Sequence, residues 1–287
     1  MKPHRIIWLF AGAVVLAAAF ILAVRDVRAP ETGLGASPMT EVMPQLSDEQ
    51  IQTPIAAMKA CLEKDPQARR ANTRSLVEAV AKLAENRRIE SADTYYALGV
   101  QRCTKRSFRA AEEAFRKAIE LRPDWKWAYN QLGIVLHSNG KTKESEAMFR
   151  KAIDLDPKWG RPHNDLAILL RLEGRLEEAE KEAKRSLELE PESVAGYNNY
   201  GNLLVAVDRY EEAESAYRRA IELEPDHPAP YYNLACLASL QGHHSEVVPL
   251  LMCAIEFDPS YREEARFDDD FIPVRGDKAF MLLVGAE

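Results

Sequence analysis

Five prolines recur along this chain at one fixed spacing. They are Pro123, Pro157, Pro191, Pro225 and Pro259, and each of these numbers exceeds the one before it by 34. A nearly constant phrase precedes the proline, as in RKAIELRP, RKAIDLDP and RRAIELEP. A fixed period of about 20–50 residues is typical of a repeat array, in which each copy is one supersecondary unit that packs on its neighbours. The spacing therefore predicts a stack of similar units rather than one large core.

Each period has the residue pattern of two short helices. When Ala92 is counted as position 1, small residues stand at positions 8 and 20, as Gly99 and Ala111 do in the first copy. Small side chains at facing positions allow two helix axes to approach to about 8–10 Å. We expect larger residues at positions 4, 7 and 24 to fill the space between copies. We expect the recurrent proline to end the second helix.

The turn between the two helices is predicted at position 15. Gly140, Gly174 and Gly242 stand there, and glycine adopts a positive φ at no steric cost. Asp208 holds the same position in the fourth copy and Arg106 in the first. We expect the same turn in all five copies.

This pattern resembles the tetratricopeptide repeat family over residues 92–261. The resemblance implies an all-α fold: a right-handed solenoid of about five helix-turn-helix repeats, 92–125, 126–159, 160–193, 194–227 and 228–261. Residues 53–91 are expected to form a degenerate repeat or N-terminal capping helices, and 262–287 a C-terminal cap. In that cap, five apolar residues are expected to cover the last helix pair: Phe267, Phe271, Phe280, Leu282 and Leu283.

The N-terminal region, 1–25, carries an uncharged apolar run from Ile6 to Val24. As a helix it would be about 28 Å long, close to the hydrocarbon thickness of a bilayer. It predicts one transmembrane anchor, followed by a flexible linker over 26–52. The alternative is a cleaved signal sequence, although a cut after Ala29 would place Pro30 at the new N-terminus.

Basic residues flank both ends of this run, so the positive-inside rule discriminates weakly between the two orientations. The short basic head favours a single-pass inner-membrane protein of bacterial type, with its repeats in the periplasm. A secreted or periplasmic protein after signal cleavage is the alternative.

The net charge of −7 argues against a nucleic-acid-binding protein, which needs a basic face. The chain has no nucleophile elbow, no phosphate loop and no H-E-x-x-H motif, so we expect no enzyme and no cofactor. Asp268, Asp269 and Asp270 lack the ligand spacing of a calcium loop, so we expect no metal site. Four cysteines, at 61, 103, 236 and 253, form no C-x-x-C pair.

Function is expected on one face of the first helices. The family resemblance implies that positions 2, 5, 9 and 12 of those helices line a concave groove. Asparagine recurs there at position 5 and at the adjacent position 6. The predicted partner-binding residues are Tyr96, Trp127, Asn130, Ile134, His137, Arg161, Asn164, Ile168, Arg171, Asn198, Asn199, Asn202, Tyr232 and Asn233.

A row of amides can hydrogen-bond the backbone of an extended peptide, with the aromatic residues offering stacking area. The alternative is that asparagine recurs simply because it tolerates exposure. On the first interpretation, Asn164 and Asn198 carry no packing role. The resemblance to clamps for chaperone C-terminal carboxylates fails, because positions 5 and 9 carry no lysine or arginine.

The predicted function is a membrane-tethered scaffold that binds a protein or peptide partner in the groove, for envelope complex assembly or secretion. One alternative is an accessory that recruits substrates to a membrane enzyme system, as in polysaccharide export or cytochrome maturation. A self-associating structural protein is the other.

Overall fold

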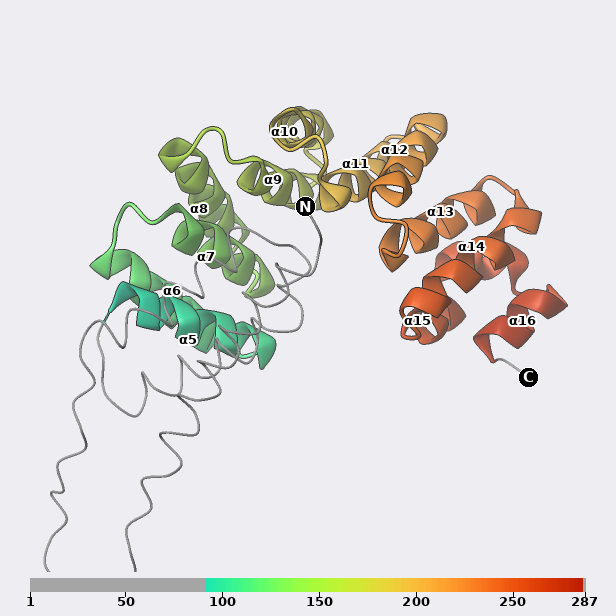
Figure 1. Ribbon diagram of the computed structural model, residues 1–287, viewed down its shortest axis with the longest axis horizontal. Coiled ribbons are helices and arrows are strands. Elements are labelled where there is room, and N and C mark those ends of the chain that lie inside the picture. Colours follow the sequence, from blue (N-terminus) through green and yellow to red (C-terminus); the bar gives the residue numbers. More distant parts are fainter. Residues whose placement is uncertain (1–90, 286–287) are drawn as a thin grey trace, which may run out of the picture. The chain divides into compact units, whose positions relative to one another are not determined.

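The computed structural model describes residues 91–285, and helices make up all their regular secondary structure (Figure 1). The first helices of the five pairs are α5 (Ala92–Thr104), α7 (Lys126–Ser138), α9 (Gly160–Leu172), α11 (Val194–Ala206) and α13 (Pro228–Leu240). The second helices are α6 (Phe108–Leu121), α8 (Thr142–Leu155), α10 (Leu176–Leu189), α12 (Tyr210–Leu223) and α14 (His244–Phe257). The predicted all-α fold of helix-turn-helix repeats is confirmed for these residues.

The pairs fall into two compact units of the chain. The α5–α6 pair belongs to the unit that ends at Pro123, and the other four pairs belong to the unit that begins at Asp124. Within the second unit each second helix packs on the first helix of the following pair, as α8 does on α9 and α10 on α11.

The turn of each pair has the predicted backbone conformation. Gly140, Gly174 and Gly242 have φ values of 76°, 75° and 78°. Arg106 and Asp208 adopt the same left-handed conformation, with φ values of 55° and 58°. The position therefore imposes its backbone geometry even where the residue is not glycine.

The close approach within a pair involves a contact that the sequence pattern misassigned. A Cβ added to Gly133 would lie 2.5 Å from the ring of Phe149, at position 24. The same relation holds between Gly99 and Phe115. The large residue at position 24 therefore packs over the small residue at position 8 of its own pair, and not solely between copies.

Positions 8 and 24 compensate for each other in volume. The three pairs with glycine at position 8 have an aromatic ring at position 24. Where alanine stands at position 8, position 24 is smaller, as in Ala167 with Ala183 and Ala235 with Leu251. Position 20 also faces position 8, because the Ser145 hydroxyl donates a 2.7 Å hydrogen bond to the Gly133 carbonyl.

Ion pairs connect the second helices of successive repeats. Arg175 contacts Glu146 at 2.7 Å, and one period later Arg209 contacts Glu180 at 2.7 Å. The hydrogen bond from Arg175 is the main cause that lowers the pKa of Glu146. These pairs are partly exposed, so we assign them a small share of the stability.

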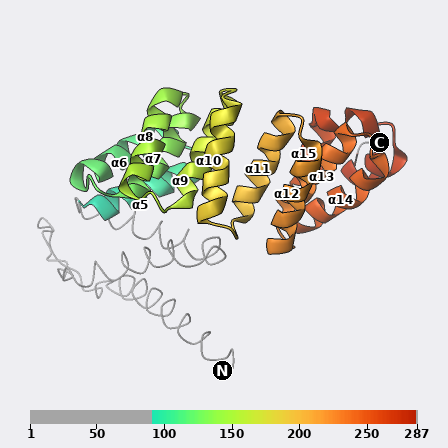
Figure 2. The ribbon, with the colours of Figure 1, turned by 90° about the horizontal axis from the view of Figure 1, so that it is seen from above.

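The C-terminal segment keeps the repeat register. It comprises α15 (Tyr261–Phe267), the 3₁₀ helix η1 (Asp269–Val274) and α16 (Lys278–Val284). α16 begins one full period after α14, and Pro273 lies within η1, where a first helix would otherwise continue. The segment is thus a shortened sixth helix pair, and Figure 2 shows α13, α14 and α15 gathered beside the C-terminal end.

Burial in this cap differs in part from the prediction. Phe271 and Phe280 are buried, and Leu283 packs against the same apolar cluster. Phe267 and Leu282 are wrong as core residues, since they are 67% and 80% exposed. The chain leaves α15 at Phe267 and turns into η1, which places Phe271 rather than Phe267 against α13.

The predicted anchor at 6–24, the linker at 26–52 and the capping segment at 53–91, apart from its last residue, Ser91, lie outside the described residues. Within residues 91–285, no helix has both the length and the apolar character required to cross a bilayer.

The left-handed turn generates the first prediction. Replacing Arg106 with Gly should raise the free energy of unfolding by about 0.5–1 kcal/mol, because glycine removes the cost of a positive φ. Gly174→Ala should lower it by about 1 kcal/mol, and the added methyl meets nothing within 4 Å, so its effect is purely conformational. Urea unfolding measures both; no change for Gly174→Ala would contradict the assignment.

The packing of position 8 on position 24 generates the second prediction. Gly133→Ala should destabilise the protein by about 1–3 kcal/mol, because the methyl overlaps the Phe149 ring. The double variant Gly133→Ala, Phe149→Leu reproduces the Ala235–Leu251 combination, so it should lose less stability than the two single variants added together. A double-mutant cycle by chemical denaturation measures this coupling, and strict additivity would exclude a direct contact.

Candidate functional site

In the second unit the predicted groove positions are partly open on α7, α9 and α11, and position 5 is open on α9 and α11. On α9 they are Asn164, Ile168 and Arg171, and on α11 they are Asn198, Asn202 and Val205; all six are half-buried. We call these six residues the asparagine face. A small pocket of about 10 Å³, roughly the space of one water molecule, lies beside Asn164, Arg171 and Asn199.

Asparagine side chains connect consecutive first helices. Asn199 Nδ2 donates to Asn164 Oδ1 at 3.1 Å, and Asn233 Nδ2 donates to Asn198 Oδ1 at 2.8 Å. Position 6 of one repeat therefore bonds to position 5 of the repeat before it. The prediction that Asn164 and Asn198 have no structural role is wrong, because both amides accept a hydrogen bond from the next helix.

A carboxylate begins this amide ladder and sets its direction. Asn130 Nδ2 donates to Asp165 Oδ2 at 2.8 Å, and Asn164 Nδ2 points at Asp165 Oδ1 at 3.5 Å. An ionised carboxylate accepts only, so the Asn164 amide must turn its nitrogen towards Asp165 and its oxygen towards Asn199. Burial raises the pKa of Asp165, and Arg161, 3.9 Å away, opposes that shift.

The ladder leaves the asparagine face rich in donors. Asn202 Oδ1 accepts a 2.7 Å hydrogen bond from the Tyr217 hydroxyl, and Asn198 Oδ1 accepts from the ladder. The Nδ2 groups of Asn198 and Asn202 have no partner among the described residues. Arg171 likewise has no carboxylate partner within residues 91–285. The face therefore combines uncommitted amide donors with one uncompensated cation.

In the fifth repeat the equivalent positions are covered. Tyr232 is buried, and its hydroxyl donates a 2.6 Å hydrogen bond to Asp268 Oδ2. Ser239 Oγ donates to the Asp270 carbonyl at 2.7 Å. Tyr232 was predicted to bind a partner, but η1 occupies that surface.

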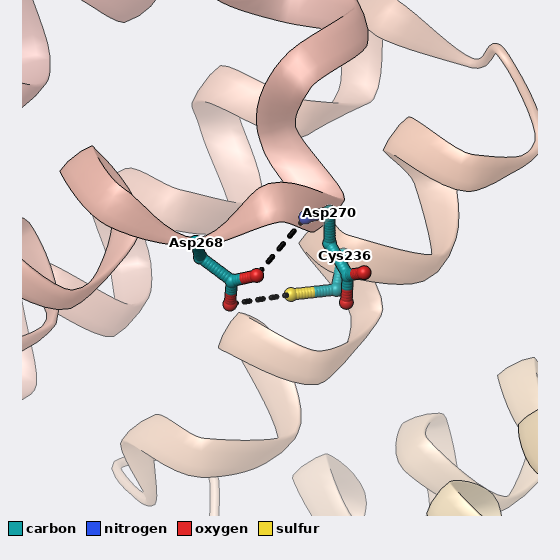
Figure 3. A group of neighbouring side chains, drawn as sticks. All are labelled: Cys236, Asp268 and Asp270. Atoms are coloured by element: carbon teal, nitrogen blue, oxygen red, sulfur yellow. Dashed lines mark hydrogen bonds between the residues drawn. The ribbon is translucent and has the colours of Figure 1, made fainter.

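Figure 3 shows Cys236, Asp268 and Asp270, whose ligand atoms lie within 4.8 Å of one another. The Asp268 oxygens accept hydrogen bonds from the Asp270 amide, the Tyr232 hydroxyl and the Cys236 thiol. Burial raises the pKa of Cys236, with the aspartates adding to the shift. Because these hydrogen bonds join the cap segment to α13, we interpret the cluster as the hydrogen-bonded attachment of the cap.

The remaining predicted residues lie in varied surroundings. Trp127 packs against Trp159 at a centroid distance of 4.2 Å, and Lys126 Nζ lies 5.1 Å from the Trp127 ring. Asn130 is 1% exposed, and Ile134 packs against the core, whereas His137 is exposed. In the first unit Tyr96 is buried and lies edge-on to Phe115. Tyr96 and Asn130 are therefore closed to a partner, whereas Trp127, Ile134 and His137 keep exposed surface.

Sequence reasoning missed the contributions of Asp165, Tyr217 and Asp268. Asp165 stands at position 6, where the next two repeats have asparagine, and its carboxyl group was the available signal. Tyr217 replaces a phenylalanine at position 24, and that extra hydroxyl bonds Asn202. Asp268 lies 36 residues after Tyr232, one more than the 35 residues of the ladder step, which a strict period does not reveal.

Two family profiles described as Tetratricopeptide repeat match the chain. One covers residues 192–260, and the other covers 92–124 and 128–158. No curated protein matches the chain significantly.

Solved structures share the fold at low sequence identity. TTC0263, a TPR protein of Thermus thermophilus, is 21% identical, with a TM-score of 0.56 over 61% of this chain and 96% of that chain. PilF of Pseudomonas aeruginosa is 19% identical, with a TM-score of 0.56 over 77% of this chain and 99% of that chain. The APC/C hetero-tetramer Cut9–Hcn1 is 13% identical, with a TM-score of 0.64 over 83% of this chain and 52% of that chain. The profile matches indicate tetratricopeptide repeats at residues 92–124, 128–158 and 192–260, and the solved structures share the fold of paired helices.

Proposed function

We propose that this chain is a non-enzymatic scaffold that binds an extended segment of a protein partner on the asparagine face. The observation that carries the proposal is the unused hydrogen-bonding capacity of α9 and α11. The ladder fixes the amides of Asn164 and Asn198 in place, and the donors of Asn198 and Asn202 remain uncommitted. Donors held rigidly by the fold lose little entropy on binding, which favours recognition of a peptide backbone.

The flanking residues supply apolar contact beside these donors. Ile168 and Val205 occupy positions 9 and 12 of the face and are half-buried. A face with both apolar and hydrogen-bonding groups suits an extended chain, whose side chains and backbone carbonyls alternate along its length. A longer bound segment would also reach neighbouring residues, which the proposal includes: Trp127, Ile134, His137, Arg161, Asn199 and Asn233.

The scaffold is further proposed to be tethered to the bacterial inner membrane through residues 6–24, with the repeats in the periplasm. The support is the uncharged apolar run from Ile6 to Val24. Assembly of an envelope complex or secretion is the corresponding role. An accessory that recruits substrates to a membrane enzyme system remains the alternative, since it would use the same face. A protein periplasmic or secreted after signal cleavage is the alternative location.

The tether generates the third prediction. The full-length protein should sediment with membranes and resist extraction by high salt or alkaline carbonate, because a spanning helix is held by apolar burial and not by charge. Fractionation followed by N-terminal sequencing measures this. A soluble protein whose N-terminus is Pro30 would instead support signal cleavage.

The asparagine face generates the fourth prediction. A photo-crosslinking residue in place of Arg171, introduced into the full chain in native membranes, should capture a defined protein partner. The same residue in place of Arg185, an exposed site on α10, is the matched control. Equal capture from both sites would contradict a partner site on this face.

Affinity for the captured partner then tests the hydrogen bonds. Asn198→Ala should weaken binding by about 0.5–1.5 kcal/mol, or roughly two- to tenfold, through the lost donor. The same variant should lower the free energy of unfolding by about 0.5–1.5 kcal/mol, because Asn233 loses its acceptor. Circular dichroism shows whether the fold persists, and unchanged affinity would exclude Asn198 from the binding surface.

A further inference from the structure

In the fifth repeat, the segment that follows α15 takes the place of a sixth first helix beside α13, and it covers positions that stay half-buried on α9 and α11. Positions 5, 9 and 12 of α13 are Tyr232, Cys236 and Ser239, and each contributes a donor. The hydroxyl of Tyr232 and the thiol of Cys236 point at Asp268 Oδ2, at 2.6 and 3.9 Å. The Ser239 hydroxyl reaches the Asp270 carbonyl at 2.7 Å. The occupant is the acidic run Asp268–Asp270.

This internal occupant presents acceptors alone to α13. One carboxylate and one backbone carbonyl receive the three donors, while Phe271 packs edge-on to Tyr232 at a centroid distance of 5.6 Å. The recognition therefore combines a carboxylate, a carbonyl and an apolar side chain that follows. All three belong to one short stretch, from Asp268 to Phe271.

The asparagine face offers the same kind of groups without an occupant among the described residues. Asn198 and Asn202 present Nδ2 donors, and their oxygens are engaged by Asn233 and Tyr217. Arg171, at position 12 of α9, adds a cation that no described carboxylate neutralises. Arg171 lines the same small pocket as Asn164 and Asn199, so the cation lies beside the amide ladder.

We propose that the asparagine face binds an acidic segment of a partner, in the way that α13 holds Asp268–Asp270. This inference rests on the proposed function, and it adds the chemical class of the partner. A carboxylate would pair with Arg171, because a guanidinium presents donors in a geometry that matches a carboxylate. Backbone carbonyls would accept from Asn198 and Asn202. A basic segment would be repelled by Arg171. The oxygens of Asn198 and Asn202, which could accept its hydrogen bonds, are already engaged.

The test uses the full-length chain in detergent and a short probe peptide. The probe has the sequence of residues 268–273, Asp-Asp-Asp-Phe-Ile-Pro, with a fluorophore at its N-terminus and an amide at its C-terminus. Its matched control carries asparagine in place of each aspartate. Fluorescence anisotropy should show binding of the acidic probe, at least about fivefold weaker binding of the control, and a decrease as salt screens Arg171.

Three variants of equal charge change separate the face from the net charge of the protein. Arg171→Gln and Asn198→Asp should each weaken binding of the acidic probe at least about fivefold, since one removes the cation and the other replaces a donor by an acceptor. Asn198→Asp keeps an oxygen for Asn233, so its unfolding midpoint should stay close to that of the wild type. Arg185→Gln lowers the charge equally on α10 and should leave binding unchanged.

Each other outcome overturns the inference in a recognisable way. Equal binding of the acidic and control probes would mean that the face binds peptides without preferring acidic ones. Binding that survives Arg171→Gln and Asn198→Asp but changes with Tyr232→Phe would mean that the probe displaces the cap on α13. No binding of the acidic probe up to about 1 mM would also overturn it. Capture of a partner from the Arg171 site would still support the proposed function in all three cases.

Discussion

The close contact between the two helices of each repeat is the constraint on which the rest of the structure depends. In the second repeat the Phe149 ring lies where a side chain on Gly133 would otherwise be, and Ser145 bonds the Gly133 carbonyl. The side chain that glycine lacks at position 8 is thus replaced by the aromatic ring at position 24. This complementary packing fixes the relative orientation of the two helices. It thereby fixes which residues of the first helix lie outside the contact and can meet other groups.

The first helices use those available residues for two purposes at once. An amide has an acceptor and donors; the ladder engages the oxygens of Asn164 and Asn198, and the Nδ2 group of Asn198 keeps its donors. At Asn164 the ionised form of Asp165 orients the amide, because a carboxylate only accepts. A structural hydrogen bond between repeats therefore determines the chemical character of the surface beside it.

The cap shows how the same surface behaves when it is covered. α15 ends after seven residues, and the chain continues as a 3₁₀ helix that contains Pro273. A 3₁₀ helix is narrower than an α-helix, so this segment lies against α13 in place of a full first helix. Asp268 then takes a place one residue beyond the ladder step and receives the Tyr232 hydroxyl. The array thus ends in an attachment made of carboxylate acceptors and aromatic packing, while Phe267 and Leu282 remain exposed.

The sequence by itself determined the period, the helix pairs and the places of the turns, because these depend on local preferences repeated at fixed spacing. The left-handed conformation of Arg106 and Asp208 came from the structure. Tertiary structure decided which atoms of Asn164 and Asn198 are engaged, because their partners, Asn199 and Asn233, lie 35 residues away. It also decided that Tyr232 is covered and Asn130 buried, since burial depends on where a neighbouring segment folds back and not on the position of a residue within its repeat.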